Sequence, residues 1–339
     1  ILEHHTVAPS VSLGIAPGSR EVLMMISQDG TLTKMIQAGA RILESACGFC
    51  IGNHQSPGSK GVSLRTSNRN FEGRSGTKDG QLYLVSPEVA ALAALYGKIV
   101  DPLTVTEIKA PSVKMPKHFL VDDSMFIFPP KNREDVVIKR GPNIGAPPLN
   151  SAISDTIKGV VTIKVGDKIT TDHIMPAGAR LKYRSNIPVY SSFVFEGVDK
   201  SFSTRALEYK ANSVANFIVA GASYGQGSSR EHAAICPMFL GVKAVIAVSI
   251  ERIHQANLCN FGILPLTFIN EEDYKAIEQG DELELDNVPS AISKALEGKA
   301  VILKNLSKNT QINLKLDITQ KQAEMLIAGG QLNLIKGVN

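Results

Sequence analysis

The feature that most constrains the fold is an irregular, proline-rich stretch over residues 101–155, which divides the chain of 339 residues into two parts. Proline fixes its own φ and removes a backbone donor, so a stretch rich in it forms neither a long helix nor a central strand. The sequence therefore predicts an extended connector between two domains, a number that also agrees with the length. The prolines follow no sustained period and stand at positions 102, 111, 116, 129, 130, 142, 147 and 148.

Apolar runs and helical periods alternate before the connector. The clearest helix start is at Ser86, Pro87 and Glu88, where a capping residue, a proline suited to the first helical position and an acid at the positive end of the helix dipole follow one another. Gly97 then marks the end of this helix. Because strands and helices alternate, we expect an α/β class. The other expected elements are a strand over 12–16, helices over 20–28 and 31–39, and a strand at 42–43.

The second domain is expected to start near Ile157. Buried strands are predicted over 160–165, 217–221, 243–250 and 263–268, where apolar runs are bounded by turn residues. Thr319 and Gln322 have the spacing of a capping box, and the helix behind them should end at Gly329. This mixture of strands and short helices predicts a compact α/β sandwich.

The composition is that of an ordinary globular protein, with 43% hydrophobic and 20% charged residues, which excludes disorder, collagen and coiled coil for the whole chain. A net charge of +4 is too small to indicate nucleic acid or an anionic membrane. The longest apolar runs are far shorter than the roughly 20 residues of a membrane span, and the first residues lack the features of a signal peptide. Four cysteines form no disulfide framework, which favours a reducing compartment and a cytoplasmic location.

Cys47 and Cys50 stand three positions apart around a Gly-Phe dipeptide, so both thiols can face one metal. The spacing alone leaves four alternatives open: a thioredoxin-type redox pair, half of a zinc site, two inert small residues, and half of an iron–sulfur site. A zinc site would need a second ligand pair, and Cys236 and Cys259 are not spaced as one.

The polar segment SNRNFEGR, residues 67–74, presents Arg69 and Arg74 five positions apart. Each guanidinium can bind a carboxylate through two parallel hydrogen bonds, so the pair suits a ligand with several carboxylates. The alternative is a solvated basic loop, which is the usual fate of two arginines.

The segment TTDH, residues 170–173, places Asp172 beside His173, and Lys182-Tyr183-Arg184 follows eleven residues after Thr171. An aspartate next to a histidine can orient it and favour its charged form. The alternative is a structural histidine with satisfied hydrogen bonds.

A glycine-rich segment, GASYGQGSSREH over residues 221–232, follows a buried strand and opens a helix. Glycine allows a ligand close to the backbone, and the amides of a helix start favour an anion. Ser228 and Ser229 offer hydroxyls there and Arg230 adds a positive charge, so a serine could serve as a base. The pattern fits neither the dinucleotide-binding fingerprint nor a P-loop. A simple capping turn with Ser228 or Ser229 as the cap is the alternative.

Four segments, ACGFCIG, SNRNFEGR, TTDHI with KYR, and YGQGSSREHAA, follow in this order and together resemble the aconitase superfamily of iron–sulfur hydro-lyases. SPEVAALAALYGKIVDP and NLCNFGILPLTF resemble it too, so the resemblance covers nearly the whole chain. It implies an α/β fold: a partial three-layer αβα aconitase domain, the C-terminal part of the iron–sulfur-binding domain, over 1–115, a linker over 116–155, and a swivelling β/β/α domain over 156–339.

The resemblance also implies roles for individual residues. Cys47 and Cys50 match two of the three cysteine ligands of a 4Fe-4S cluster, and Asn68 lies near that cluster. Ser228 matches the base that removes a proton beside a carboxylate, and Asp172 matches a catalytic acid that is often paired with a basic neighbour. The residues that would bind and orient the substrate are Arg69, Arg74, Arg184, Ser229 and Arg230.

The third cysteine ligand of the family lies in a Ser-Cys-Thr-Asn-type motif, which does not occur here. The family's Asp–His pairs and the glutamate near the iron also belong to earlier domains. We therefore expect the chain to be the C-terminal portion of a member of the short bacterial type. We expect its partner to be the missing N-terminal portion, and the isolated chain to be inactive.

The implied reaction is the isomerisation of citrate and isocitrate through cis-aconitate, a step of the tricarboxylic acid cycle, with a tricarboxylate as substrate. Arg184 favours a third, polar carboxylate, and isopropylmalate isomerases tend to have a cysteine before GSSREH. Homoaconitase, methylcitrate dehydratase and isopropylmalate isomerase stay open. A function of another class is RNA binding in the cluster-free form, but no Lys/Arg run or aromatic-interleaved basic segment supports nucleic acid as a partner.

Overall fold

The computed structural model describes residues 1–46, 48–68, 70, 72–227 and 230–337. The chain divides into two units, Ile1–Val136 (unit 1) and Val137–Asn339 (unit 2). The predicted linker over 116–155 contains the junction between them, and the domain limits at 115 and 156 stay predictions. From Val105 to Asn132 the backbone forms no helix or strand, as the proline content of this stretch predicts.

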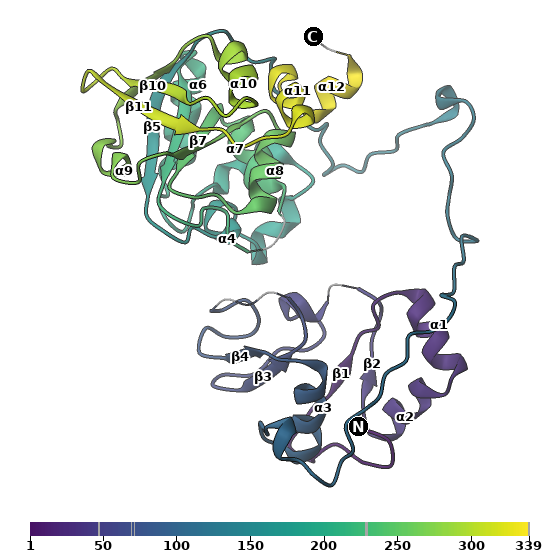
Figure 1. Ribbon diagram of the computed structural model, residues 1–339. Helices are drawn as coiled ribbons and strands as arrows, with labels where there is room; N and C mark the ends of the chain where they lie inside the picture. Colours follow the sequence, from purple (N-terminus) through teal and green to yellow (C-terminus); the bar gives the residue numbers. More distant parts are fainter. Residues whose placement is uncertain (47, 69, 71, 228–229, 338–339) are drawn as a thin grey trace. The chain divides into compact units, whose positions relative to one another are not determined.

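Unit 1 is built from short parallel strand pairs and helices (Figure 1). Strand β1 (Gly14–Ile15) pairs with β2 (Arg41–Ile42), and β3 (Val62–Arg65) pairs with β4 (Gln81–Leu84). The helices are α1 (Arg20–Gln28), α2 (Thr31–Gln37) and α3 (Pro87–Tyr96), with 3-10 turns η1 (Phe49–Ile51), η2 (Pro102–Thr104) and η3 (Arg133–Asp135).

Helix α3 forms where its capping residues predict it. The Ser86 hydroxyl accepts a hydrogen bond from the Val89 amide at 3.3 Å, Pro87 occupies the first turn, and Gly97 ends the helix with φ of 68°. A left-handed backbone conformation costs glycine little conformational energy, which explains why the helix stops there. The prediction for this helix is confirmed, and so is the helix over 20–28.

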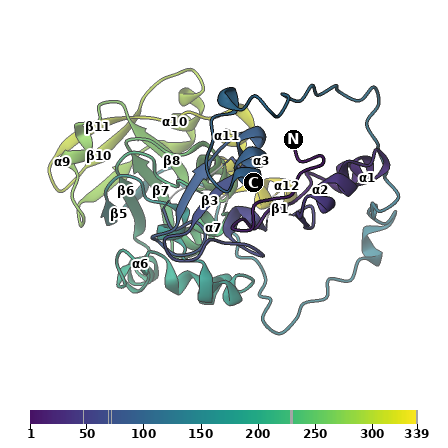
Figure 2. The ribbon, with the colours of Figure 1, turned by 90° about the horizontal axis from the view of Figure 1, so that it is seen from below.

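Unit 2 is organised around a closed barrel of mixed strands, seen in Figures 1 and 2. Its parallel part runs through β5 (Ile157–Val165), β6 (Ala215–Ala220), β7 (Val242–Ala247) and β8 (Leu264–Phe268). Antiparallel strands β9 (Glu282–Leu285), β10 (Val301–Asn305) and β11 (Thr310–Lys315) close it in the order β10-β11-β8-β7-β6-β5-β9. The expected α/β class is confirmed, but the strands form a closed barrel where a compact sandwich was expected, because the strand pattern does not show that β9 pairs with both β5 and β10.

Short helices cover the barrel because its strands are apolar on both faces. Along β6, Ile218 and Ala220 belong to one buried core and Phe217 and Val219 to another, so the strand reads as a continuous apolar run. The covering helices are α4 (Thr171–Ile174), η4 (Gly178–Tyr183), α5 (Ile187–Tyr190), η5 (Ser191–Phe193), α6 (Phe202–Ala211), α7 (His232–Phe239), α8 (Arg252–Asn260), α9 (Asp273–Ala276), α10 (Val288–Ala295), α11 (Gln320–Ala328) and α12 (Gln331–Lys336).

The sequence also predicts the start of α11 correctly. The Thr319 side chain accepts from the Gln322 amide, the Gln322 side chain accepts from the Thr319 amide at 2.8 Å, and Gly329 ends the helix with φ of 80°. The parallel strands place their carboxyl ends, at Val165, Ala220 and Ala247, together at one end of the barrel. In sheets of this kind ligands usually bind outside the carboxyl ends of the strands.

Candidate functional site

The Gly-rich loop, residues 221–231, lies at the carboxyl end of β6 and packs against the loop that follows β5. The Gly225 amide donates to the Ile169 carbonyl at 2.7 Å, and the Thr171 amide donates to the Gln226 carbonyl at 2.8 Å. Two predicted motifs that are about fifty residues apart in the sequence are thereby joined through their backbones. The geometry agrees with the usual place of a ligand site in parallel sheets.

A side-chain ion pair joins Arg230 of the Gly-rich loop to Asp172 in α4. Arg230 Nη1 lies 2.5 Å from Asp172 Oδ1 and donates to the Met175 carbonyl at 2.8 Å. The Arg230 side chain is 16% exposed and that of Asp172 is 37% exposed. Both bonds use Nη1, and Nε and Nη2 have no hydrogen-bond partner among the residues that the structure describes. A held guanidinium with donors left over suits an incoming carboxylate.

His173 has a structural place rather than a partnership with Asp172. Its Nδ1 accepts from the Thr170 amide at 3.1 Å, and its own amide donates to the Thr170 hydroxyl at 3.1 Å, which closes a capping box on α4. The alternative of a structural histidine with satisfied hydrogen bonds is confirmed, and the suggestion that Asp172 orients His173 is wrong. Consecutive residues on a helical turn face different directions, and Asp172 faces Arg230 instead.

Arg184 lies exposed at the end of η4, close to the start of α7. The Arg184 carbonyl lies 3.0 Å from His232 Nε2, and the His232 ring packs edge-on against Tyr190 with ring centroids 5.3 Å apart. Within the described residues no hydrogen bond or ion pair holds the guanidinium of Arg184. His232 is thus a supporting residue that sequence reasoning missed, although the GSSREH motif contains it.

Arg180 shows by contrast how an arginine of the same segment can be occupied. Its Nη2 and Nε bond to the two oxygens of the Glu196 carboxylate at 2.7 and 3.1 Å, and its guanidinium lies 4.1 Å from the centre of the Phe193 ring. This bidentate pair uses guanidinium donors of Arg180 that a ligand would need, whereas no described residue uses the guanidinium donors of Arg184.

In unit 1 the second cysteine of the pair lies against an arginine of the next motif. Arg74 Nε donates to the Cys50 carbonyl and Arg74 Nη2 to the Cys50 sulfur, both at 2.8 Å. A positive group beside sulfur favours the thiolate, which is the form that binds metals. Asn68 is exposed in the bend after β3. The structure thus brings Cys50 and Arg74 together. The order of the motifs in the sequence does not by itself predict this contact.

Arg65 supports this loop, and sequence reasoning passed over it. It donates to the Phe49 carbonyl and, at 2.7 Å, to the Ser75 hydroxyl, which is buried. Burial, and then repulsion by Arg74, lower the pKa of Arg65 against an opposing effect of Cys50. The signal available in the sequence was a third arginine two positions before Ser67. A cavity of about 240 Å³ adjoins the cysteine loop and is lined in part by Gly48, Glu44 and His54.

Four predicted site residues lie outside the described residues: Cys47, Arg69, Ser228 and Ser229. The described neighbours of the two serines are Gly227 and Arg230. Helix α7 begins at His232 with Glu231 at the capping position. The alternative of a capping turn at Ser228 or Ser229 falls on residues outside the described ones.

The described residues do not by themselves complete a three-thiolate cluster site. Cys236 in α7 and Cys259 in α8 are wholly buried, and burial raises the pKa of each thiol to about 12. A neutral thiol in an apolar core is a poor metal ligand. Among the described residues no three His, Cys, Asp or Glu side chains lie together in a way that could hold a metal ion. The same part of the chain has no helix long and apolar enough to span a bilayer.

Two family models match the chain. The model of the aconitase family (aconitate hydratase) matches residues 1–97, and that of the aconitase C-terminal domain matches residues 169–271. Both ranges carry the motifs described above, and together they account for more than half of the chain.

Individual relatives match over almost the whole chain. It is 30% identical to "Homocitrate dehydratase, mitochondrial" of Saccharomyces cerevisiae, over 97% of this chain and 48% of that protein. It is 32% identical to "Aconitate hydratase, mitochondrial" of Gracilaria gracilis, over 98% of this chain and 48% of that protein. The chain therefore spans about half the length of the curated relatives it matches.

Among solved structures, a 3-isopropylmalate dehydratase from Methanocaldococcus jannaschii is 32% identical over 54% of this chain and 94% of its own, with a TM-score of 0.41. The two family models and the four motifs in their order agree on one assignment. The chain belongs to the aconitase superfamily.

Proposed function

We propose that this chain is part of a hydro-lyase that isomerises citrate and isocitrate through cis-aconitate. The observation that supports it most is the Arg230–Asp172 pair at the Gly-rich loop, with Arg184 in the same unit, whose guanidinium no described residue binds. A tricarboxylate needs several fixed cations, and arginine binds each carboxylate through two parallel hydrogen bonds.

In the proposed reaction the chain's own residues bind the substrate and move a proton. Ser228 Oγ, in its deprotonated form, takes the proton from the carbon beside a carboxylate. The hydroxyl of the neighbouring carbon takes a proton from the proposed acid and leaves as water, and a double bond forms between the two carbons. Water then adds to the double bond in the opposite sense. Arg184 and Arg230 hold carboxylates while charge develops, which lowers the barrier by electrostatic stabilisation. Asp172 holds Arg230 in place and is the proposed acid.

We further propose that Cys47 and Cys50 are two ligands of a 4Fe-4S cluster and that the remaining ligand comes from outside this chain. The support is the Arg74 guanidinium on the Cys50 sulfur and the burial of Cys236 and Cys259 in unit 2. Such a cluster would supply Lewis-acid chemistry. Arg69 and Arg74 are the proposed carboxylate-binding residues of unit 1, and Asn68 and Ser229 are proposed to lie at the site.

The substrate is citrate in this proposal, with homocitrate as the second candidate because the yeast relative carries the name homocitrate dehydratase. The two acids differ by one methylene, which a binding pocket discriminates by about 1–3 kcal/mol. Parallel assays with citrate and homocitrate therefore decide between them, through the ratio of kcat/KM.

The carboxylate-binding role can be tested on the chain itself by titration calorimetry with citrate. Arg184→Gln and Arg230→Gln should each weaken binding by at least about tenfold, since each removes a charged carboxylate contact. Arg180→Gln is the matched control, because Glu196 already occupies that guanidinium, and its affinity should stay near that of the wild type. Equal affinities in all four proteins would overturn the proposal.

The cluster assignment is tested by anaerobic reconstitution with iron and sulfide. We expect the chain alone to hold no stable cluster and to form no cis-aconitate, and both properties to appear when a polypeptide with the missing thiolate is added. Full activity of the chain alone would contradict the assignment of the last ligand. We also propose a cytoplasmic location, with the mitochondrion as the alternative suggested by the names of the relatives; cell fractionation distinguishes the two.

A further inference from the structure

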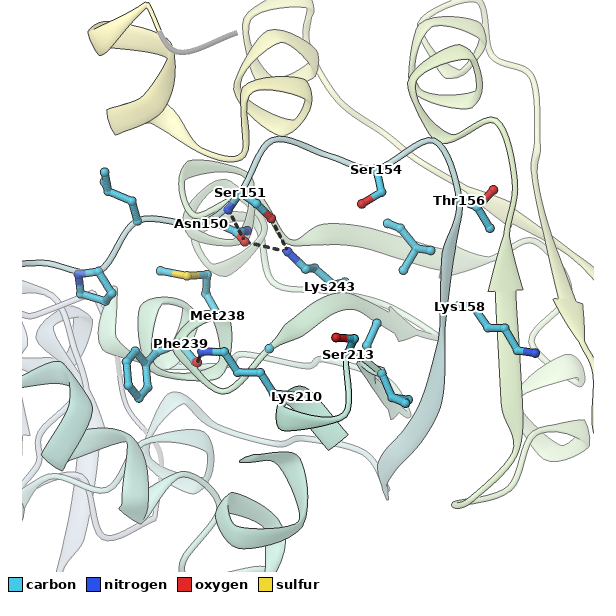
Figure 3. A pocket seen from close by; sticks show the side chains of 16 residues that line it. Asn150, Ser151, Ser154, Thr156, Lys158, Lys210, Ser213, Met238, Phe239 and Lys243 are labelled. Carbon is cyan, nitrogen blue, oxygen red and sulfur yellow. Dashed lines mark hydrogen bonds between the residues drawn. The ribbon is translucent and has the colours of Figure 1, made fainter. Parts of the chain in front are cut away.

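Figure 3 shows a recess in unit 2, and its lining residues place it at the end of the barrel opposite to the Gly-rich loop. It is lined by residues at the amino ends of β5, β6 and β7, by the chain segment 148–156 before β5 and by the end of α7, and its volume is about 560 Å³. The Gly-rich loop follows the carboxyl end of β6, so the two places are separated by the length of the strands. The proposed hydro-lyase chemistry makes no use of this recess.

Lys243 is the central cation of the recess. Its Nζ donates to Asn150 Oδ1 at 2.8 Å and to Ser151 Oγ at 3.2 Å, as the dashed lines in Figure 3 show. An ammonium has three donors, and the third has no partner among the described residues, while both bonded partners, Asn150 and Ser151, are uncharged. Burial, and then the charge of Lys210, lower the pKa of Lys243.

The other charges around the recess are also positive. The Lys210 ammonium donates to the Phe239 carbonyl, and Lys158 lies 3.8 Å from Glu282 in a pair of which both members are more than half exposed. No Asp or Glu is among the residues that line the recess. An anion there would meet attraction from two amines and no repulsion from a lining carboxylate.

Hydroxyl groups and an apolar wall complete the surroundings. Ser154 and Ser213 line the recess, and their side chains have no hydrogen-bond partner among the described residues. Met238 and Phe239 form an apolar side. Lysine binds phosphate as a point charge, and hydroxyls donate to the phosphate oxygens.

We propose that this recess binds a phosphate dianion, free or carried by a small organic molecule, with Lys243 and Lys210 as its cations. The site is independent of the citrate site proposed above and lies at the other end of the same barrel. A ligand bound there would contact Ser151 and Ser154 of the segment 148–156, the segment that precedes the first barrel strand.

The test measures binding of inorganic phosphate and of phenyl phosphate to the whole chain by titration calorimetry, at constant ionic strength. Saturable binding is expected for the wild type, with at least about tenfold weaker binding for Lys243→Gln and for Lys210→Gln. Lys321→Gln, an exposed position on α11 outside the recess, is the control and should bind like the wild type. Each variant is first checked for a native circular dichroism spectrum. If one of the two recess variants fails to fold, the other one alone carries the test.

Tighter binding of phenyl phosphate supports an organic phosphate, because the ring would lie on the apolar side, and equal binding supports free phosphate. The proposal is overturned by an absence of saturable binding, or by unchanged affinity in both recess variants. Citrate affinity is measured in the same proteins. It should be unaffected by Lys243→Gln, so a failure of this site is distinguishable from a failure of the proposed function.

Discussion

Units 1 and 2 position their polar groups in different ways. In unit 1 the described buried apolar side chains are few and mostly small: Ala38, Ala40, Leu92, Ala93 and Ala94. Two arginines there are held by the short 3-10 turn η1, since Arg65 bonds to the Phe49 carbonyl and Arg74 to Cys50. In unit 2 the candidate residues follow strands of a barrel whose interior side chains, such as Phe217 and Ile246, are completely buried.

The difference shows what each kind of support can do. A closed barrel pairs its strand edges and fixes the loops at its ends, so Asp172 and Arg230 meet across two neighbouring strand ends. Loops without a large core depend on their own hydrogen bonds, and their free energy of local opening is correspondingly small. This contrast between a closed barrel and a unit without a large core leads to three predictions, given from the largest expected effect to the smallest.

The largest effect is expected in the barrel core. Phe217→Ala should lower the free energy of unfolding of unit 2 by about 3–5 kcal/mol, because it removes a wholly buried ring and leaves a cavity. Leu92→Ala, its counterpart in unit 1, should cost about 2 kcal/mol, at the lower end for this substitution, because its buried neighbours are small. Hydrogen exchange resolved by peptide measures each loss, and an equal loss in both units would contradict the comparison.

The second effect concerns pH and the buried His254 of α8. Burial lowers its pKa from 6.5 to about 4, and both ring nitrogens lack a hydrogen-bond partner among the described residues. Between these two pKa values the imidazole is protonated in the unfolded chain but neutral in the folded chain. The free energy of unfolding therefore falls as the pH drops from about 6.5 to about 4. The whole loss is about 3 kcal/mol at pH 4.

Urea unfolding at a series of pH values measures this loss. His254→Asn should remove most of the slope between pH 6.5 and 4, whereas His5→Asn, at an exposed position, should leave it unchanged. A slope that persists in His254→Asn would show that other groups carry the acid sensitivity.

The smallest effect of the three is expected at Gly225, in the Gly-rich loop. A Cβ atom there would lie 2.3 Å from the His254 ring, and φ is 82°, a left-handed value that strains any other residue. Gly225→Ala should cost about 2 kcal/mol and displace the loop, with weaker citrate binding as a second readout. Gly197→Ala is the matched control, since no atom lies within 4 Å of its Cβ position, and its thermal midpoint should hardly change.

Much of the local structure follows from short-range patterns. The helix at Ser86, the capping box at Thr319 and the buried strand over 217–221 depend on residues within a few positions of one another, and these predictions are confirmed. The pairing of Asp172 with its neighbour His173 was wrong for the opposite reason. Adjacency in the sequence suggested it, but the helical turn sends the two side chains in different directions.

By itself the sequence determined the α/β class, the break at the proline-rich stretch and the family, because all three are carried by local composition, periodicity and ordered motifs. Only the tertiary structure decided that the barrel closes, that Arg230 pairs with Asp172 and that Arg74 lies on Cys50. It also decided that Glu196 occupies Arg180 while no described residue binds the Arg184 guanidinium. These are contacts between residues distant in sequence. Which of several possible partners a charged group meets depends on how strands and loops are brought together, and that information lies in long-range packing rather than in any short segment.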